Sequence, residues 1–287
     1  MHVEIVGAGV IGSAFGRALL GKGHSVHWVD CDPDRVRGLR TQGIEASMPH
    51  EPAEPVSLYF ICVPTPTKGN DQDRAALAEA LVRVSSLLRP EILPTIVIRS
   101  TMLPGTSRRW AIPFVERASG LRHGTQFRLV CLPEFLREKR AEADALAPRI
   151  HLLGELEPGH GDAVADLLMC LGAPVTRVSL EAAELQKYVH NAFNALKITF
   201  FNEMRRVAAG MNPPGDAEAI FSVTCQSAEG MWNPSYGTLD LGPVSGKCLP
   251  KDVDALRGWL RSHDLDAPLL EALAGSLEKK NRSSDRS

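Results

Sequence analysis

The chain has 287 residues, 44% of them apolar, which is enough for two packed domains with a real core. Its formal net charge of −2 gives no electrostatic reason to expect nucleic acid or a membrane surface as a partner. No run of about 18 apolar residues is present, so we expect no transmembrane helix. The start, MHVEIVGAG, enters a strand pattern directly, and this predicts that no signal peptide is present.

The six cysteines form no CxxC pair, so we expect no disulfide framework, and a reducing cytoplasm is the expected location. Cys62 and Cys131 lie inside apolar runs, and we expect most of the cysteines to be reduced core residues. The histidines are scattered along the chain. His24 and His27 would point to opposite faces of a strand, so no metal site is expected.

The first 30 residues form a strand, a glycine turn, a helix and a second strand that ends in Asp30. In the turn GAGVIG, the glycines let backbone N–H groups approach a pyrophosphate at the helix N-terminus. Asp30 would accept hydrogen bonds from ribose hydroxyls and repel a 2′-phosphate, which favours NAD over NADP, while the nearby Arg35 and Arg37 count against that preference. The expected cofactor-binding residues are Gly7, Gly9, Val10, Ile11, Gly12, Asp30 and Arg35, with Val63, Pro64, Thr65, Ser100 and Thr101 from later loops.

Short apolar runs alternate with amphipathic helices in the segment that follows. This alternation predicts an α/β fold with a Rossmann-like, doubly wound parallel sheet. In such sheets, ligands bind beyond the carboxyl ends of the strands. The expected strands are SLYFICV, TIVIRS and FRLVCL, the expected helix is RAALAEALVRVSSLL, and the loops at the strand ends are 62–67, 100–106 and 132–140.

After about residue 180 the pattern becomes helical, and residues 181–210 predict one long connecting helix that stops at Gly210. Lys187, Asn191, Asn194 and Asn202 fall near one stripe of this largely apolar helix, and such a stripe is either solvated or lines a site. Further helices are expected over 252–262 and 267–280. We expect an NAD-binding domain over 1–180, a smaller helical domain for catalysis and dimerisation over 181–280, and a disordered tail over 281–287.

Cys248 stands between the loop GPVSGK and the residues LPKD, where it is either a small hydrophobic residue or a nucleophile. Pro250 is typical of a first helical turn and Asp252 falls in the same turn, so Cys248 is expected just before a helix N-terminus. A free thiol is mostly protonated at pH 7, and a helix N-terminus favours the reactive thiolate. This position indicates a nucleophile.

Six segments of the chain follow one another in the order typical of one enzyme family. They are GAGVIG, FICVPTPT, RSTMLPGT, PEFLRE, AELQKYVHNAFNALKITFFNE and CLPKDVDAL. On these segments the chain resembles the UDP-glucose/GDP-mannose 6-dehydrogenase family. The resemblance implies oxidation of a primary alcohol to a carboxylate with two NAD, through a cysteine thiohemiacetal that is oxidised to a thioester and then hydrolysed.

The resemblance also implies a role for each matching residue. Cys248 would be the nucleophile, and Lys187 and Asn191 would stabilise the alkoxide and thiohemiacetal oxygens, so that the polar stripe lines the site. Asp252 would organise the hydrolytic water, Glu134 would act as acid and base in thioester hydrolysis, and Thr101 would position water or nicotinamide. The residues expected at the substrate are Glu134, Phe135, Leu136, Lys187, Asn191, Gly246 and Lys247.

A homodimer is expected through the 181–210 helix, which the resemblance places at a subunit interface. The helix also carries more apolar surface than one small domain could cover. The apolar residues behind this expectation are Phe193, Leu196, Ile198, Phe200 and Phe201.

The sequence departs from the family pattern in three ways. Family members usually have a third, C-terminal domain that completes the nucleotide pocket, and this chain ends near where the connection to it would begin. Ser245-Gly246-Lys247 stands where Gly-Gly-Ser is usual. Leu132 replaces an asparagine, and no arginine matches the one that reaches the substrate from a neighbouring subunit. We therefore expect a sugar-nucleotide-like or smaller substrate, such as a phosphorylated or otherwise anionic one that Lys247 could contact.

Three other functions stay open. The protein could be a true nucleotide-sugar 6-dehydrogenase that works without the third domain. It could be a two-electron dehydrogenase of the β-hydroxyacid type with a helix-borne lysine, but such an enzyme would not need Cys248 or Glu134. It could also be a non-catalytic NAD-binding paralogue. A paralogue that has lost catalysis would seldom keep the cysteine, lysine, asparagine, aspartate and glutamate together.

Overall fold

The computed structural model describes residues 1–239, 244 and 248–284, with side chains as far as residue 277. The chain divides into two compact units, Met1–His190 and Asn191–Ser287. The division between the units falls within the helix Leu180–Gly210. The domain limits expected from the sequence stay a prediction. The last helix ends at Ser284, inside the segment 281–287 that was expected to be disordered.

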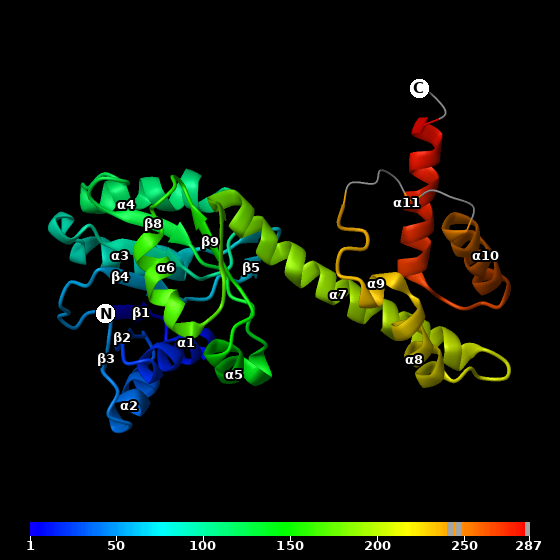
Figure 1. Ribbon diagram of the computed structural model, residues 1–287, viewed down its shortest axis with the longest axis horizontal. Coiled ribbons are helices and arrows are strands. Elements are labelled where there is room, and N and C mark those ends of the chain that lie inside the picture. The colour runs from blue at the N-terminus through cyan, green and yellow to red at the C-terminus, as the bar shows by residue number, and fades with distance from the viewer. Residues whose placement is uncertain (240–243, 245–247, 285–287) are drawn as a thin grey trace. The chain divides into compact units, whose positions relative to one another are not determined.

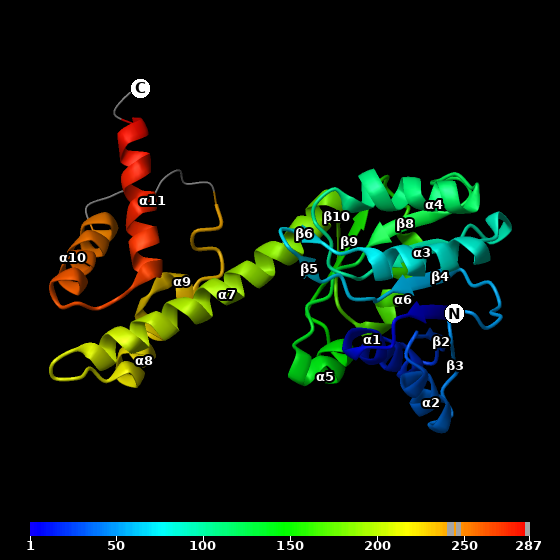
Figure 2. The same cartoon turned by 180° about the vertical axis from the view of Figure 1, so that it is seen from behind.

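The first unit is built on an eight-stranded sheet, most of whose strands are labelled in Figures 1 and 2. Its strands are β1 (His2–Val6), β2 (Ser25–Val29), β3 (Ala46–Ser47), β4 (Leu58–Ile61), β7 (Thr95–Ile98), β8 (Arg128–Cys131), β9 (His151–Glu155) and β10 (Val175–Ser179). The strand order is β10-β9-β8-β7-β4-β1-β2-β3. All neighbours run parallel except β8 and β9, which pair antiparallel where Cys131 faces Gly154. The expected strands are thus confirmed, while the sheet is parallel in all but one pairing.

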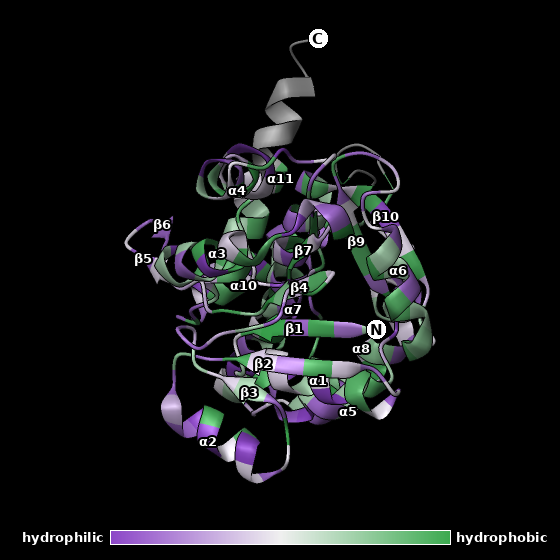
Figure 3. Cartoon of the chain, turned by 90° about the vertical axis from the view of Figure 1, so that its left-hand side faces the viewer, coloured by the Kyte–Doolittle hydropathy of each residue, from purple (hydrophilic) through white to green (hydrophobic). Residues whose placement is uncertain are grey.

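The central strands are apolar because they are covered on both faces. In β4, Leu58 and Phe60 contribute to one core cluster, whereas Tyr59 and Ile61 contribute to the other. All four residues of β4 and of β7 are buried. In Figure 3 the green of hydrophobic residues dominates β4 at the centre of the unit.

Helices cover the two faces of the sheet, as Figures 1 and 2 show from opposite sides. One core cluster includes residues of α1 (Val10–Gly21), α2 (Pro33–Thr41), α5 (Ala141–Leu146) and α6 (Asp162–Leu168). The other includes residues of α3 (Ala75–Leu87), α4 (Ile112–Ser119) and the first turn of α7 (Leu180–Gly210). Smaller elements are the hairpin β5 (Thr67–Lys68) and β6 (Asp71–Gln72), the π-helical turn Ser107–Ala111, and 3-10 turns at Pro90–Ile92, Glu138–Arg140 and Met169–Leu171.

The second unit is helical, with a small core around Val207 and Leu260. Its buried Glu203 accepts hydrogen bonds from the backbone N–H groups of Leu269 (2.9 Å) and Leu270 (3.0 Å), which caps the last helix. The long helix expected over 181–210 is confirmed as α7, and with it the expected fold class. The other helices are α8 (Ala217–Ser227), α9 (Glu229–Trp232), α10 (Leu249–Ser262) and α11 (Pro268–Ser284).

The expectation that most cysteines lie in the core is wrong. All six are free thiols, but Cys131 alone is fully buried, and Cys31, Cys225 and Cys248 are exposed. Helices cover the cysteine that lies within a strand, whereas these three lie on loops or helix surfaces. Within the described part of the chain, no helix is both long and apolar enough to cross a membrane.

Candidate active site

The turn between β1 and α1 needs glycine for two different reasons. Gly7 has a φ of +102°, in a left-handed region that residues with a side chain rarely adopt. At Gly12 the reason is space, because a Cβ would lie 1.9 Å from the carbonyl oxygen of Gly7. Gly9 caps the N-terminus of α1 with extended backbone and no side-chain hydrogen bond. A Cβ on Gly9 would meet only a guanidinium nitrogen of Arg35, at 4.0 Å. The turn is therefore open where the first N–H groups of α1 could bind a pyrophosphate, beside Val10 and Ile11.

Asp30 is buried and tied to this turn. One of its carboxylate oxygens accepts a hydrogen bond from the N–H of Ala8 (2.6 Å), and the other accepts from the N–H of Asp32 (2.8 Å). The guanidinium of Arg35 lies 3.5 Å from Asp30 and 3.5 Å from Asp32. Arg35 is thus held between two carboxylates, and its charge is less available to a 2′-phosphate than a free arginine would be.

We predict that NAD binds well and NADP poorly, because the carboxylate of Asp30 would repel a 2′-phosphate. The change Asp30→Ala should weaken NAD binding about tenfold or more, which is the usual cost of losing a charged hydrogen-bond partner. It should also reduce the difference in affinity between NAD and NADP. Asp34→Ala, at an exposed position on α2, is the matched control. Isothermal titration measures both affinities, and equal affinity of the unchanged protein for the two cofactors would contradict the prediction.

The loop after β7 is anchored by three other segments. The carbonyl oxygen of Thr101 accepts hydrogen bonds from the hydroxyl of Thr65 (2.6 Å) and the amide of Gln72 (2.7 Å). The Ser100 hydroxyl donates to the carbonyl of Val63 (2.7 Å), which is followed by Pro64. Farther along, the buried carboxylate of Glu184 accepts from the N–H groups of Gly105 (2.5 Å) and Ser107 (2.7 Å). The expected residues 63–65 and 100–101 therefore meet at the carboxyl edge of the sheet.

Lys187 and Glu134 form a buried ion pair in the same unit. The Lys187 Nζ donates to a carboxylate oxygen of Glu134 (2.7 Å) and to its backbone carbonyl oxygen (2.5 Å). The other carboxylate oxygen accepts from the N–H of Leu136 (2.7 Å), and the ring of Phe135 lies 5.8 Å from the ammonium. Lys187 is only 6% exposed. The expected site residues Glu134, Phe135, Leu136 and Lys187 thus lie together, with the ion pair among them.

Two cysteines of the sheet are poor nucleophiles. Burial raises the pKa of the Cys62 thiol to about 11, partly offset by the nearby guanidinium of Arg99. Burial also raises the pKa of the Cys131 thiol, and the neighbouring Glu184 adds to this effect. Since the thiolate is the reactive form, these two thiols are poor candidates for the nucleophile expected from the sequence.

Cys248 lies exposed at the N-cap of α10, as expected from its sequence position. Pro250 is in the first turn, and the N–H of Asp252 donates to the carbonyl oxygen of Cys248 (3.0 Å). The carboxylate of Asp252 is exposed and pairs with the ammonium of Lys251 (2.5 Å). Asn191 is exposed on α7, while Gly246 and Lys247 lie outside the described residues. These residues belong to the second unit.

Sequence reasoning missed three residues of the first unit. Gln72 and Glu184 hold the Thr101 loop through its backbone, which no sequence pattern reveals. Arg99 is buried at the end of β7, and its guanidinium lies 4.0 Å from the centre of the Phe15 ring. A charged residue directly after an apolar strand, as in TIVIRS, is the one signal that could have drawn attention to Arg99.

Two family models match most of the chain. Residues 44–171 match the NAD binding domain of the UDP-glucose/GDP-mannose dehydrogenase family, and residues 181–276 match its central domain. The chain belongs to this family. It is therefore a dehydrogenase with an NAD binding domain, and the expected family and cofactor are confirmed. Residues 3–75 also match the family model of ketopantoate reductase.

Known members of the family are similar over almost the whole chain. GDP-mannose 6-dehydrogenase of Pseudomonas putida is 33% identical over 98% of this chain and 68% of its own length. UDP-glucose 6-dehydrogenase AglM of Haloferax volcanii is 29% identical over 95% of this chain and 68% of its own length. The crystal structure of GDP-mannose dehydrogenase from Pseudomonas aeruginosa superposes with a TM-score of 0.86 at 30% identity, over 98% of this chain and 69% of that chain.

Proposed function

We propose that the protein oxidises the primary alcohol of a nucleotide-linked sugar to a carboxylate, with GDP-mannose as the first candidate substrate. The observation that carries this proposal is the buried Lys187–Glu134 pair at the carboxyl edge of an NAD-binding sheet. GDP-mannose 6-dehydrogenases are among the relatives that match nearly the whole chain. In this proposal residues 1–180 bind NAD, and residues 181–280 supply the cysteine.

The first oxidation needs a positive charge near the reacting oxygen. The hydroxyl loses its proton to water and the carbon loses a hydride, which leaves an aldehyde. The turn between β1 and α1, with Asp30, would hold NAD, which would supply the hydride acceptor for each of the two oxidations. The ammonium of Lys187 would stabilise the alkoxide that develops, with help from the amide of Asn191. Lys187 is suited to this because burial strengthens its electrostatic interactions.

The second oxidation needs a nucleophile. The thiolate of Cys248 adds to the aldehyde carbon and forms a thiohemiacetal, which loses a hydride and becomes a thioester. Cys248 is exposed at the N-cap of α10. A water molecule then attacks the thioester carbon, the carbon–sulfur bond breaks, and the thiolate returns. Glu134 would take the proton from this water and Asp252 would help to orient it.

Glu134→Gln should separate hydrolysis from oxidation. An amide cannot take the proton from water, so thioester hydrolysis should slow by about 10²-fold or more. The acylated enzyme should then accumulate and appear as added mass on the peptide that contains Cys248. Glu138→Gln, at an exposed position four residues later, is the control and should show no added mass. Loss of activity without any covalent adduct would contradict the assigned role.

The identity of the substrate is tested separately. NADH formation would be compared for GDP-mannose, UDP-glucose and mannose 1-phosphate at equal concentration. A second candidate, a smaller phosphorylated alcohol, rests on Lys247, which supplies a charge where the family usually has a serine. Higher kcat/KM for GDP-mannose supports the first candidate, and higher kcat/KM for mannose 1-phosphate supports the second.

A homodimer through α7 completes the proposal. Four apolar residues of α7 recur at intervals of three and four and are more than half exposed, so they form one stripe on the helix. Phe201, counted toward this surface from the sequence, instead packs against Phe221 of α8, with ring centres 5.0 Å apart. The stripe consists of Leu185, Val189, Phe193 and Leu196.

We predict that Phe193→Asp shifts the protein from dimer toward monomer, because the new charge would be buried between two copies of the stripe. Light scattering after gel filtration at micromolar concentration measures the mass. Ala195→Asp adds the same charge to α7 away from the stripe and should leave the mass unchanged. A monomeric mass for the unchanged protein would refute the dimer.

A further inference from the structure

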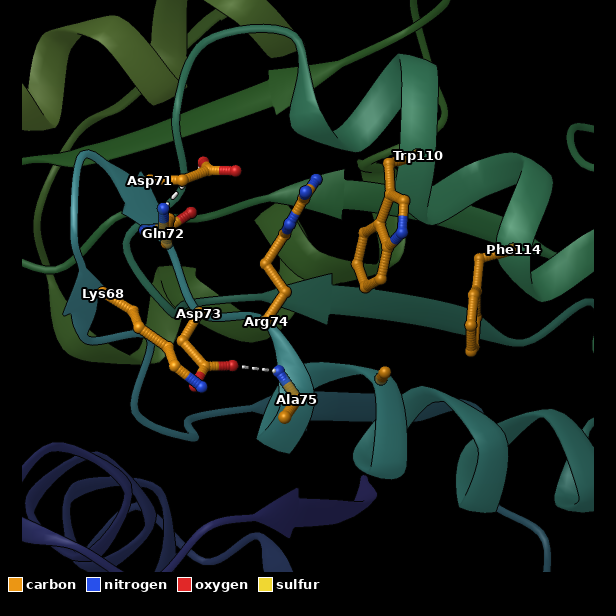
Figure 4. Close-up of a pocket in the computed structure, with 9 residues that line it drawn as sticks. Lys68, Asp71, Gln72, Asp73, Arg74, Ala75, Trp110 and Phe114 are labelled. Atoms are coloured by element: carbon orange, nitrogen blue, oxygen red, sulfur yellow. Dashed lines mark hydrogen bonds between the residues drawn. The ribbon is translucent and has the colours of Figure 1, made fainter.

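The first unit has a pocket of about 490 Å³ that is separate from the Lys187–Glu134 pair. It lies between the β5–β6 hairpin, the start of α3, and the aromatic residues before and within α4, as Figure 4 shows. None of the expected site residues lines it. The lining residues are Lys68, Asp71, Gln72, Asp73, Arg74, Ala75, Ala78, Trp110 and Phe114.

One half of the pocket is an apolar slot. Trp110 and Phe114 stand side by side with ring centres 5.2 Å apart and planes tilted by 32°, too close for a further ring between them. Across from these rings, α3 presents only the methyl groups of Ala75 and Ala78. Both rings stay partly exposed because these small side chains do not fill the space. The slot can therefore accept a planar ring against an aromatic wall.

The other half of the pocket carries two acidic and two basic side chains, and the acidic ones accept hydrogen bonds from neighbouring backbone groups. One oxygen of Asp71 accepts from the N–H of Gln72 (2.7 Å), and one oxygen of Asp73 accepts from the N–H of Ala75 (2.9 Å). These carboxylates thus satisfy local backbone groups. Within the described part of the chain neither Lys68 nor Arg74 forms an ion pair, and the Arg74 guanidinium lies 5.1 Å from the centre of the Trp110 ring. The two cations remain available to an anion.

We propose that this pocket binds an aromatic anion, with its ring between Ala78 and Trp110 and its negative group at Lys68 and Arg74. A nucleotide and an aromatic carboxylate share this chemistry. The proposal does not depend on the function proposed above. The pocket wall includes Gln72, whose amide binds the carbonyl oxygen of Thr101, so a ligand here would touch a residue that holds the candidate active-site loop.

Ligand-observed NMR titrations in the presence of saturating NADH test the proposal. The probes are guanosine 5′-monophosphate and indole-3-acetate, which combine ring and anion, together with guanosine and inorganic phosphate, which carry only one part each. At least one combined probe should bind, and each single-part probe should bind about tenfold more weakly or worse. The tighter of the two combined probes identifies a phosphate or a carboxylate as the preferred anion.

Two variants alter the pocket in different ways. Ala78→Met fills the slot and Arg74→Gln removes a charge, and each should weaken binding of the combined probe about tenfold or more. Val82→Met, at an exposed position on the same helix, and Arg122→Gln, at an exposed loop position, are the matched controls and should keep the affinity. Thermal unfolding checks that all variants fold. Binding that Ala78→Met and Arg74→Gln leave unchanged would overturn the proposal, as would the absence of saturable binding of both combined probes up to about 10 mM.

Discussion

The change Cys248→Ser is expected to stop the reaction before the second oxidation. A serine hydroxyl ionises far less readily than a thiol and is a much poorer nucleophile toward an aldehyde. We expect kcat for carboxylate formation to fall at least about 10³-fold, measured as the acid product by mass spectrometry.

The matched control is Cys225→Ser, since Cys225 is also an exposed free cysteine, on α8. Its activity should stay close to that of the unchanged protein. If both variants kept full carboxylate production, Cys248 would not be the nucleophile. If both lost it equally, the loss would reflect damage to the second unit rather than missing chemistry.

The change Lys187→Met is expected to remove the charge that we propose to stabilise the alkoxide, while keeping a side chain of similar length. Loss of one buried electrostatic stabiliser typically costs about 10²- to 10³-fold in kcat. The substitution also leaves the Glu134 carboxylate buried without its partner, which costs about 3–5 kcal/mol of folding stability. Both kcat and the free energy of unfolding should therefore fall.

A double variant separates these two effects. Adding Glu134→Gln to Lys187→Met removes the unpaired charge and should restore part of the stability, but not the rate of the first oxidation, a step in which Glu134 has no assigned role. Lys139→Met, at an exposed position, should change neither quantity. Recovery of the rate of the first oxidation along with stability in the double variant would show that Lys187 acts only through folding.

Five strands, β1, β2, β4, β7 and β8, could be predicted because continuous apolar runs are typical of strands covered on both faces. The strands β3 and β9 were not predicted from the sequence. The strand β10, with the sequence VTRVS, was missed because it lies at the edge of the sheet and is half polar. The antiparallel pairing of β8 with β9 was missed for another reason. Strand direction depends on the path of the chain between strands, and no local pattern records it.

The candidate site could be predicted only as a set of residues. Lys187 and Glu134 are 53 positions apart, and their ion pair depends on how α7 packs against the loop after β8. Gln72 was missed because it acts on Thr101 through the backbone, from a two-residue strand of a hairpin. The cysteines show the same limit, since an apolar neighbourhood in the sequence predicts burial within strands but says little about cysteines on loops and helix surfaces.

The yield of NADH per molecule of limiting sugar substrate tests the central claim most directly. With GDP-mannose, or whichever substrate the comparison selects, the thioester route predicts two NADH per substrate and little free aldehyde. A yield of one NADH, together with full rate in Cys248→Ala, would contradict the thioester route. A two-electron oxidation centred on Lys187 would then replace it.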